Sequence, residues 1–188
     1  LITVANLAAT YWEARQLDKS VPLFEELLAH WEKNLGRDHF NTQRMVGNLG
    51  VNLKDADRLA EAIPLLEEAY RASKQDSRLE FVGPALFDAY SKASKSAPEN
   101  IAKATVVMKE RIAASRAVLP KESLNLAGQL AFFGLTSLEL KAWAEAETLI
   151  REALTIREAK APDDWRTHNT RSMLGGALLG QQKHAEAE

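Results

Sequence analysis

The residues of this sequence that could do chemistry are its four histidines and its carboxylates, because the chain contains no cysteine. Two pairs, Glu26 with His30 and His184 with Glu188, are four residues apart, so a helix would place both side chains of a pair on one face. Neither pair has a third ligand at a fixed spacing, and the sequence contains no HExxH motif. We therefore interpret both pairs as solvated surface residues, and we expect no catalytic residue, no metal site and no cofactor.

A glycine-rich stretch near the C-terminus imitates the start of a phosphate-binding loop. Residues 175–180 read GGALLG, but Gln181 and Gln182 stand where lysine and serine or threonine would be needed to bind phosphate and magnesium. No strand pattern precedes the stretch. We expect these glycines to allow helices to pack closely.

The charge balance argues against two classes of partner. With 24 basic and 26 acidic residues, the chain has no global field that would attract nucleic acid or an anionic membrane. No apolar run approaches the roughly 20 residues that span a bilayer, and no signal-peptide pattern opens the sequence. The lack of cysteine fits a reducing compartment. We predict a cytoplasmic, soluble protein that binds neither nucleic acid nor membrane.

The elements that must position any functional side chain are repeated helices. Residues 6–28 return 42 residues later as residues 48–70, with eight of 23 positions identical. Within each copy, apolar residues at steps of three and four predict two helices, at about 2–15 and 19–33 in the first copy. The pattern predicts an all-α chain of antiparallel helix pairs, with repeats at about 1–42, 43–79, 80–122 and 123–166 and a partial repeat at 167–188.

The third repeat departs from the others. Leu86 follows its counterpart Leu49 after only 37 residues, because the preceding loop shrinks to residues 76–78. The turn between its two helices expands to about residues 91–100. We expect this insertion either to leave the neighbouring surface open or to cover it.

The small and large residues of the first two repeats resemble the tetratricopeptide consensus. They are Leu7, Ala8, Tyr11, Ser20, Phe24 and Leu27, which recur as Leu49, Gly50, Leu53, Ala62, Leu66 and Ala69. We expect Leu7 and Tyr11 to lie on the core stripe of the first helix, and the small residues Ala8, Ser20, Gly50 and Ala62 to lie where the two helices of a pair approach closely. The common tetratricopeptide repeat has about 34 residues. Units of 42 residues with the closing loop LGRDHFNT, residues 35–42, resemble the kinesin-light-chain variety. Residues 141–188 are similar to the repeat tails of planctomycete-type bacterial serine/threonine kinases, although the chain has no kinase motif.

The resemblance implies a right-handed superhelical solenoid that forms a single domain, residues 1–188, with a concave face lined by the first helix of each repeat. It places the partner-binding residues on that face: Asn6, Ala9, Trp12, Glu13, Arg44, Asn48, Lys54, Asp55, Phe81 and Asp88. The same positions of the fourth repeat are Gly128, Ala131, Phe132, Leu135 and Leu138, so the face should turn from polar to apolar. Two alternatives stay open: each asparagine could bond to a neighbouring helix, and Trp12 could be partly buried instead of stacking on a ligand.

We therefore expect a non-catalytic scaffold that binds a protein or peptide. The resemblance adds two alternatives, an adaptor on a tubulin-like cytoskeletal filament and the partner-recruiting region of a kinase whose catalytic domain lies in the same chain. A clamp for a C-terminal carboxylate, with cations on successive first helices, is disfavoured because Ala85 and Phe132 occupy those positions.

The C-terminal end suggests one further property. The fifth repeat is incomplete, so Leu174, Leu178 and Leu179 should be exposed, frayed or packed against another copy of the chain. This predicts possible self-association through the incomplete repeat, and we expect the sequence to be a fragment or the ordered part of a longer protein.

Overall fold

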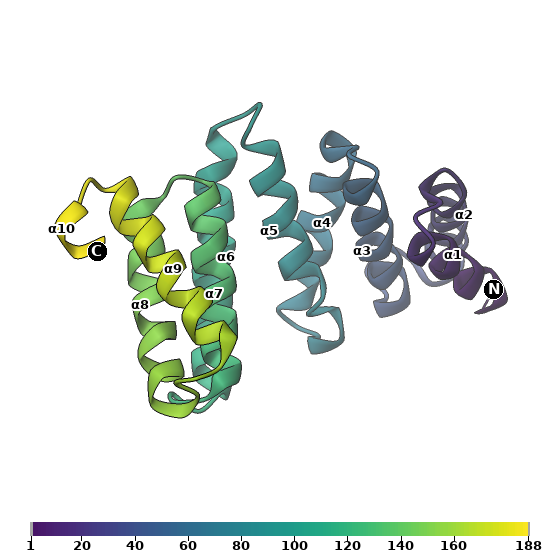
Figure 1. Ribbon diagram of the computed structural model, residues 1–188. Coiled ribbons are helices and arrows are strands. Elements are labelled where there is room, and N and C mark those ends of the chain that lie inside the picture. Colours follow the sequence, from purple (N-terminus) through teal and green to yellow (C-terminus); the bar gives the residue numbers. More distant parts are fainter. Residues whose placement is uncertain (1, 188) are drawn as a thin grey trace. The chain divides into compact units, whose positions relative to one another are not determined.

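The computed structural model describes residues 2–187, and these residues form helices joined by short loops, without a strand (Figure 1). The helices are α1 (Ile2–Glu13), α2 (Leu17–Leu35), α3 (Phe40–Asp55), α4 (Leu59–Ser73), the short 3-10 helix η1 (Ser77–Leu79), α5 (Val82–Ala93), α6 (Glu99–Val118), α7 (Leu124–Glu139), α8 (Trp143–Lys160), α9 (Trp165–Gly180) and α10 (His184–Ala187). The all-α prediction is confirmed, and α1 packs against α2, α3 against α4 and α7 against α8. The predicted repeat boundaries stay a prediction.

The chain divides into two compact units. Unit one ends at Val107 and contains α1 to α5 with the first half of α6, and unit two begins at Met108 and contains the remaining helices. The expectation of a single domain over residues 1–188 stays a prediction.

The turn from the first to the second helix of a pair has the same backbone in four repeats. Arg15, Asp57, Lys141 and Gln182 each adopt a positive φ between 57° and 62°. The amide of the following residue bonds to the carbonyl five residues before it, as in the 2.9 Å bond from Arg58 to Leu53. This pattern is the Schellman ending of a helix, which satisfies carbonyls that the helix leaves unpaired.

In the third repeat the insertion replaces this turn. Helix α5 continues to Ala93 and α6 begins at Glu99, so the irregular connection is residues 94–98. The shortened loop before this repeat folds into η1, whose Leu79 is buried.

Small residues in unit one lie where the helices of a pair approach closely. Ala8, Ser20 and Ala62 are fully buried, and a Cβ atom added to Gly50 would lie 2.8 Å from Cγ of Leu66. The packing role predicted for these positions is therefore confirmed. Ser20 adds a polar contact that the sequence did not suggest, because its hydroxyl donates to Asn52 Oδ1 at 2.7 Å in the buried interior.

The prediction that Leu7 of unit one lies in the core is wrong. Leu7 is 45% exposed, whereas its counterpart Leu49 is buried. The reason is that α3 packs against both α2 and α4, whereas α1 packs mainly against α2 and no described helix precedes it. The same residue type at the same repeat position thus has a different environment.

In unit two, glycines again mark close helix crossings. A Cβ atom on Gly134 of α7 would lie 2.5 Å from Cγ1 of Ile150, and one on Gly180 would lie 2.3 Å from the Trp143 ring. The interpretation of the stretch 175–180 as packing glycines is supported most directly at Gly180.

The end of unit two contradicts part of our expectation for the incomplete repeat. Leu178 is only 2% exposed and Leu174 is half-buried, whereas Leu179 is 55% exposed. Helix α9 packs against α8, so the chain itself covers Leu178. Of the three leucines, Leu179 alone has the predicted exposure.

Polar contacts hold the chain after α9 against α8. Glu147 of α8 accepts hydrogen bonds from Gln181 at 2.7 Å and Lys183 at 2.8 Å, and it also pairs with Arg151. These three donors, led by Lys183, lower the pKa of Glu147 to about 2.

Candidate functional site

The inner face of unit one, formed by α1, α3 and α5, carries a continuous chain of polar contacts. The indole N–H of Trp12 donates to Asp55 Oδ2 at 2.7 Å, and Asp55 Oδ1 lies 3.0 Å from Lys54 Nζ. Lys54 in turn donates to Asp88 Oδ2 at 2.8 Å, and Asp88 also pairs with Lys92 at 3.1 Å. We call these five residues the inner-face ladder, and it connects all three helices.

The centre of the ladder is shielded from water. The side chains of Lys54 and Asp55 are 12% and 11% exposed. Burial alone would lower the pKa of Lys54, but its bonds to Asp88 and Asp55 outweigh this effect and raise the pKa above its usual value. Burial likewise opposes the ionisation of Asp88, and the bonds from Lys54 and Lys92 hold its pKa below the usual value. Lys54 and Asp88 therefore stay ionised and paired at neutral pH.

Four of the predicted partner-binding residues, Trp12, Lys54, Asp55 and Asp88, are thus bound to one another. The indole of Trp12 is half-buried and its N–H group is occupied, so the partial-burial alternative describes its state in the free protein. The sequence missed this because side chains on adjacent first helices meet only when the repeats stack.

The other predicted residues of unit one make none of the contacts that define the ladder. Asn6, Glu13 and Arg44 are exposed, Ala9 and Asn48 are half-buried, and Phe81 is 39% exposed. The side-chain amides of Asn6 and Asn48 make no hydrogen bond within the described part of the chain, whereas the backbone carbonyl of Asn48 accepts from Asn52 Nδ2 at 2.9 Å.

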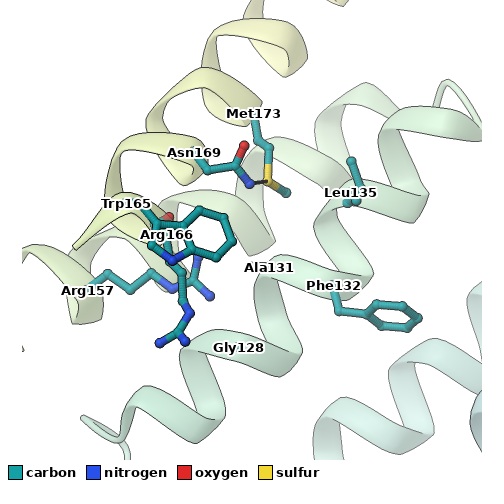
Figure 2. A pocket seen from close by; sticks show the side chains of 9 residues that line it. All are labelled: Gly128, Ala131, Phe132, Leu135, Arg157, Trp165, Arg166, Asn169 and Met173. Atoms are coloured by element: carbon teal, nitrogen blue, oxygen red, sulfur yellow. Dashed lines mark hydrogen bonds between the residues drawn. The ribbon is translucent and has the colours of Figure 1, made fainter. Parts of the chain in front are cut away.

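The inner face of unit two is hollow where that of unit one is filled. A pocket of about 200 Å³ lies between α7 and α9, next to the C-terminal end of α8 (Figure 2). Its lining residues are Gly128, Ala131, Phe132, Leu135, Arg157, Trp165, Arg166, Asn169 and Met173. Four of them, Gly128, Ala131, Phe132 and Leu135, are the inner-face positions predicted for the fourth repeat, and none of the four has a polar side chain.

Small residues create the space in this pocket. A Cβ atom added to Gly128 would meet nothing within 4 Å, and Ala131 fills only the floor beside it. Trp165 begins α9 and is 68% exposed, and Phe132 is 50% exposed. Large apolar side chains exposed this far are unusual for a residue that only stabilises a core.

The sequence did not identify the cationic side of the pocket. Arg157 reaches it from α8, a second helix of a pair, and Arg166 lies in the first turn of α9. Figure 2 shows both guanidinium groups at the same end of the pocket, near the indole of Trp165. The prediction from sequence assigned the inner face to the first helix of each repeat, and it therefore missed Arg157, which lies on a second helix.

The two arginines are incompletely neutralised. Arg157 Nη1 donates to the carbonyl oxygen of Arg166 at 3.0 Å and to the Thr170 hydroxyl, but no described carboxylate forms an ion pair with Arg157. Burial, together with the charge of Arg166, lowers the pKa of Arg157. The nearest partner of Arg166 is Asp164, with Oδ2 3.6 Å from Nη1, and Asp164 Oδ1 is already bonded to the backbone amide of Arg166.

Neither metal binding nor membrane crossing finds support among residues 2–187. No group of three or more histidine and carboxylate side chains in this range could hold a metal ion. The pair of His184 and Glu188 is not tested, because Glu188 lies outside the described residues. None of the described helices combines the length and apolar character needed to cross a membrane.

Comparisons with known proteins find a family match over part of the sequence and a similar fold over nearly all of it. Residues 1–75 match the family model described as a tetratricopeptide repeat. The crystal structure of the nearly identical TPR-like repeats of a candidate kinesin light chain from Podosopora anserina matches 100% of this chain and 89% of its own, with a TM-score of 0.82 and 19% identity. BtubC (BKLC) from P. vanneervenii matches over 98% of this chain and 74% of its own, with a TM-score of 0.72 and 15% identity. The curated proteins contain no match.

These comparisons confirm the predicted fold. At such identities, the solved structures show only that this chain shares their fold of stacked helix pairs, and they show nothing of the ligand. The similarity of residues 141–188 to kinase tails stays a prediction.

Proposed function

We propose that this array of tetratricopeptide repeats is a non-catalytic module that binds another protein through its inner face. Stacked helix pairs present an extended surface that is suited to a peptide or partner helix. The observation that carries the proposal is the pocket of unit two, where Phe132 and Trp165 are exposed around a floor of Gly128 and Ala131. A soluble domain would ordinarily fill or cover such a site, unless a partner does so.

A structural role for the perturbed ionisable groups supports the non-catalytic part of the proposal. Shifted pKa values also occur in active sites, but those of Lys54, Asp88 and Glu147 follow from ion pairs. The pair of Lys54 and Asp88 joins α3 to α5, and the pair of Glu147 and Lys183 joins α8 to the loop after α9. Each of these groups is engaged with its partner and stabilises the stack.

The polar inner face of unit one would contribute contacts of a second kind. Asn6, Glu13 and Arg44 are exposed, and the half-buried Ala9 and Asn48 lie on the same helices. A side-chain amide can donate to and accept from an extended peptide backbone. We propose that these residues and Phe81 bind the partner directly, and that Trp12, Lys54, Asp55 and Asp88 hold the helices that present them.

Three finer proposals go with this function. The chain would act in the cytoplasm, either as an adaptor on a tubulin-like filament or as the partner-recruiting region of a serine/threonine kinase. Co-sedimentation with such filaments tests the adaptor, and the full reading frame tests the kinase.

Self-association would depend on Leu179 at the C-terminal repeat, since Leu178 is covered. Analytical ultracentrifugation of the wild type and Leu179→Ser tests that contact.

A pull-down from the native host tests the proposed function. Proteins retained by the immobilised chain would be quantified for the wild type, for Asn6→Ala with Asn48→Ala, and for Gly128→Leu, which fills the pocket. We expect at least one retained protein to fall about fivefold or more in one of the variants, the effect of losing a single good contact of about 1 kcal/mol. If the wild type and the two variants retained every host protein equally, a binding role for the inner face would be refuted.

A further inference from the structure

The side chains that line the pocket of unit two offer hydrogen-bond donors but few acceptors. Arg157, Arg166 and Trp165 carry N–H groups and no accepting atom. Among the lining side chains, Asn169 supplies the one amide oxygen, and the weakly accepting Sδ of Met173 already takes a hydrogen bond from Asn169 Nδ2 at 3.7 Å. A ligand that fits this lining must accept hydrogen bonds and bring few donors of its own.

One end of the pocket is also cationic. Figure 2 shows Arg157 and Arg166 there together, and Asp164 is the only described carboxylate that pairs with either of them. Asp164 is divided between two groups, because it also accepts from the backbone amide of Arg166 at 2.7 Å. Planar guanidinium groups bind carboxylates through parallel hydrogen bonds. This end of the pocket therefore favours a carboxylate on the ligand.

The remainder of the pocket is apolar and small. Its floor is Gly128 and Ala131, with Trp165 beside them. An engineered apolar cavity of about 150 Å³ holds one benzene molecule, and this pocket encloses about 200 Å³, so a benzene ring fits together with a carboxylate and a short link. Trp165 is 68% exposed and favours an aromatic ligand, because stacking stabilises two rings beyond the area that they bury.

We propose that this pocket binds a small free aromatic acid. The ring lies against Trp165, Gly128 and Ala131, and the carboxylate binds to Arg157 and Arg166. An aromatic carboxylate has no N–H group, so it brings no donor into a site that is poor in acceptors. A peptide segment would bring an N–H group with almost every residue, and a donor left without a partner weakens binding. The site goes beyond the proposed function, because its ligand requires no protein partner.

Titration with phenylacetate, followed by two-dimensional amide NMR, tests the ligand class. Phenylacetate should saturate the protein with a dissociation constant of about 1 mM or lower, as a well-bound ligand of its size does. Phenylacetamide keeps the ring but lacks the charge, and it should bind about tenfold or more weakly. Cyclohexylacetate keeps the charge but lacks the aromatic ring, and it should bind about threefold or more weakly. No saturable binding of phenylacetate, or equal binding of either analogue, would overturn the proposal.

A further ligand distinguishes a free acid from the end of a peptide chain. N-acetylphenylalanine has the same ring and carboxylate but adds an amide N–H group, for which Asn169 is the one amide acceptor among the lining side chains. We expect it to bind about threefold or more weakly than phenylacetate. Equal or tighter binding of N-acetylphenylalanine would show that the pocket accepts a chain end, and it would contradict the assignment to a free acid.

Matched variants locate the binding. Gly128→Leu fills the floor and Arg166→Gln removes one cation, and each should weaken phenylacetate binding about tenfold or more. Gly128→Ala adds a methyl group that meets nothing within 4 Å, and Arg171→Gln removes an exposed arginine of the same helix that pairs with Glu158, so both should bind as the wild type does. A loss of affinity in Arg171→Gln equal to that in Arg166→Gln would show nonspecific attraction and refute the site.

The titration and the pull-down fail separately. A host protein that is retained by the wild type and lost in Gly128→Leu, while phenylacetate does not saturate, would leave the proposed function standing and overturn the aromatic acid. Phenylacetate that binds with the expected preferences, while no host protein depends on the inner face, would do the reverse.

Discussion

The two inner faces of this chain are built from equivalent helix positions but differ in what fills them. In unit one, Trp12 and Lys54 occupy the same position of successive repeats and are bonded within the ladder. Leu138 is their counterpart in unit two, where α7 presents Gly128 and Ala131 to an open pocket. The repeat thus fixes the backbone, while the side chains decide whether a face is closed by its own contacts or left for a partner.

The largest effect should come from breaking the ladder at its centre. Lys54→Met leaves two carboxylates, Asp55 and Asp88, without their shared cation, and Asp55 is 11% exposed. Removing one partner of a shielded ion pair costs about 3 kcal/mol. We expect hydrogen exchange to accelerate in α1, α3 and α5 of unit one, and less in α8 and α9.

The control for this variant is Lys92→Met, which removes the exposed end of the same ladder. Pairs of exposed charges contribute roughly 0–1 kcal/mol, and Lys92 is such a residue. If the two lysine variants had equal effects, the ladder would not be the closed, shielded structure that separates unit one from unit two.

Replacing two glycines of α7 by alanine should change the stability of unit two in opposite directions. Gly134→Ala would place Cβ 2.5 Å from the buried Ile150, and we expect a loss of about 2 kcal/mol from overpacking. Gly128→Ala adds a Cβ to open space in a helix, and it should raise stability by up to about 1 kcal/mol because glycine is a poor helix former. Urea unfolding of both variants measures the difference, and a stability loss in Gly128→Ala would show that the pocket is already filled.

The aromatic end of the ladder should have a smaller effect. Trp12→Phe keeps a ring but removes the N–H group that bonds to Asp55. We expect a loss of about 1 kcal/mol, because Asp55 retains Lys54 and lies 3.5 Å from Arg15. Thermal unfolding followed by circular dichroism measures it. A loss as large as that of Lys54→Met would mean that Trp12, and not the lysine, anchors the ladder.

The smallest expected effect is the loss of stability at low pH when Glu147 is protonated. The pKa of Glu147 in unit two is about 2 in the folded chain, below its ordinary value near 4.3 in an unfolded one. The stabilisation from Glu147 is therefore fully present above about pH 4.3 and is lost as the pH falls towards 2. Because its partners are largely exposed to solvent, we expect only a fraction of a kcal/mol.

Comparing the wild type with Glu147→Gln by urea unfolding at pH 5, 3 and 2 isolates this contribution. The two proteins should differ at pH 5 and converge by pH 2. Asp88 of unit one should follow the same direction, because its pKa is also lowered. A difference between wild type and variant that grows towards pH 2 would contradict the assignment.

Particular residues show how far prediction from sequence reached. The pattern of Ala8, Ser20 and Gly50 located the close helix contacts, because small size is required wherever two backbones approach. The repeat pattern placed Leu7 in the core, and the incomplete fifth repeat suggested that Leu178 is exposed. Both predictions were wrong, because the burial of a residue depends on which neighbouring helix covers it.

The candidate site was predictable in its apolar half only. Gly128, Ala131, Phe132 and Leu135 follow from the helix period of the fourth repeat, and they do line the pocket. Arg157 could not be found in this way, since a long side chain from α8 reaches a surface assigned to first helices. Likewise, Asp55 and Trp12 are 43 residues apart, and only stacking brings them within hydrogen-bond distance.

The helix pairs, their 42-residue period and the positions of small residues could be read from the amino-acid sequence, because they follow from local periodicity and steric size. The contacts of Lys54 with Asp55 and Asp88, and the placement of Arg157 and Arg166 beside one apolar pocket, are visible only in the folded chain. Charge pairing and cavity shape depend on side chains from different helices, and their distances exist only after the repeats have stacked.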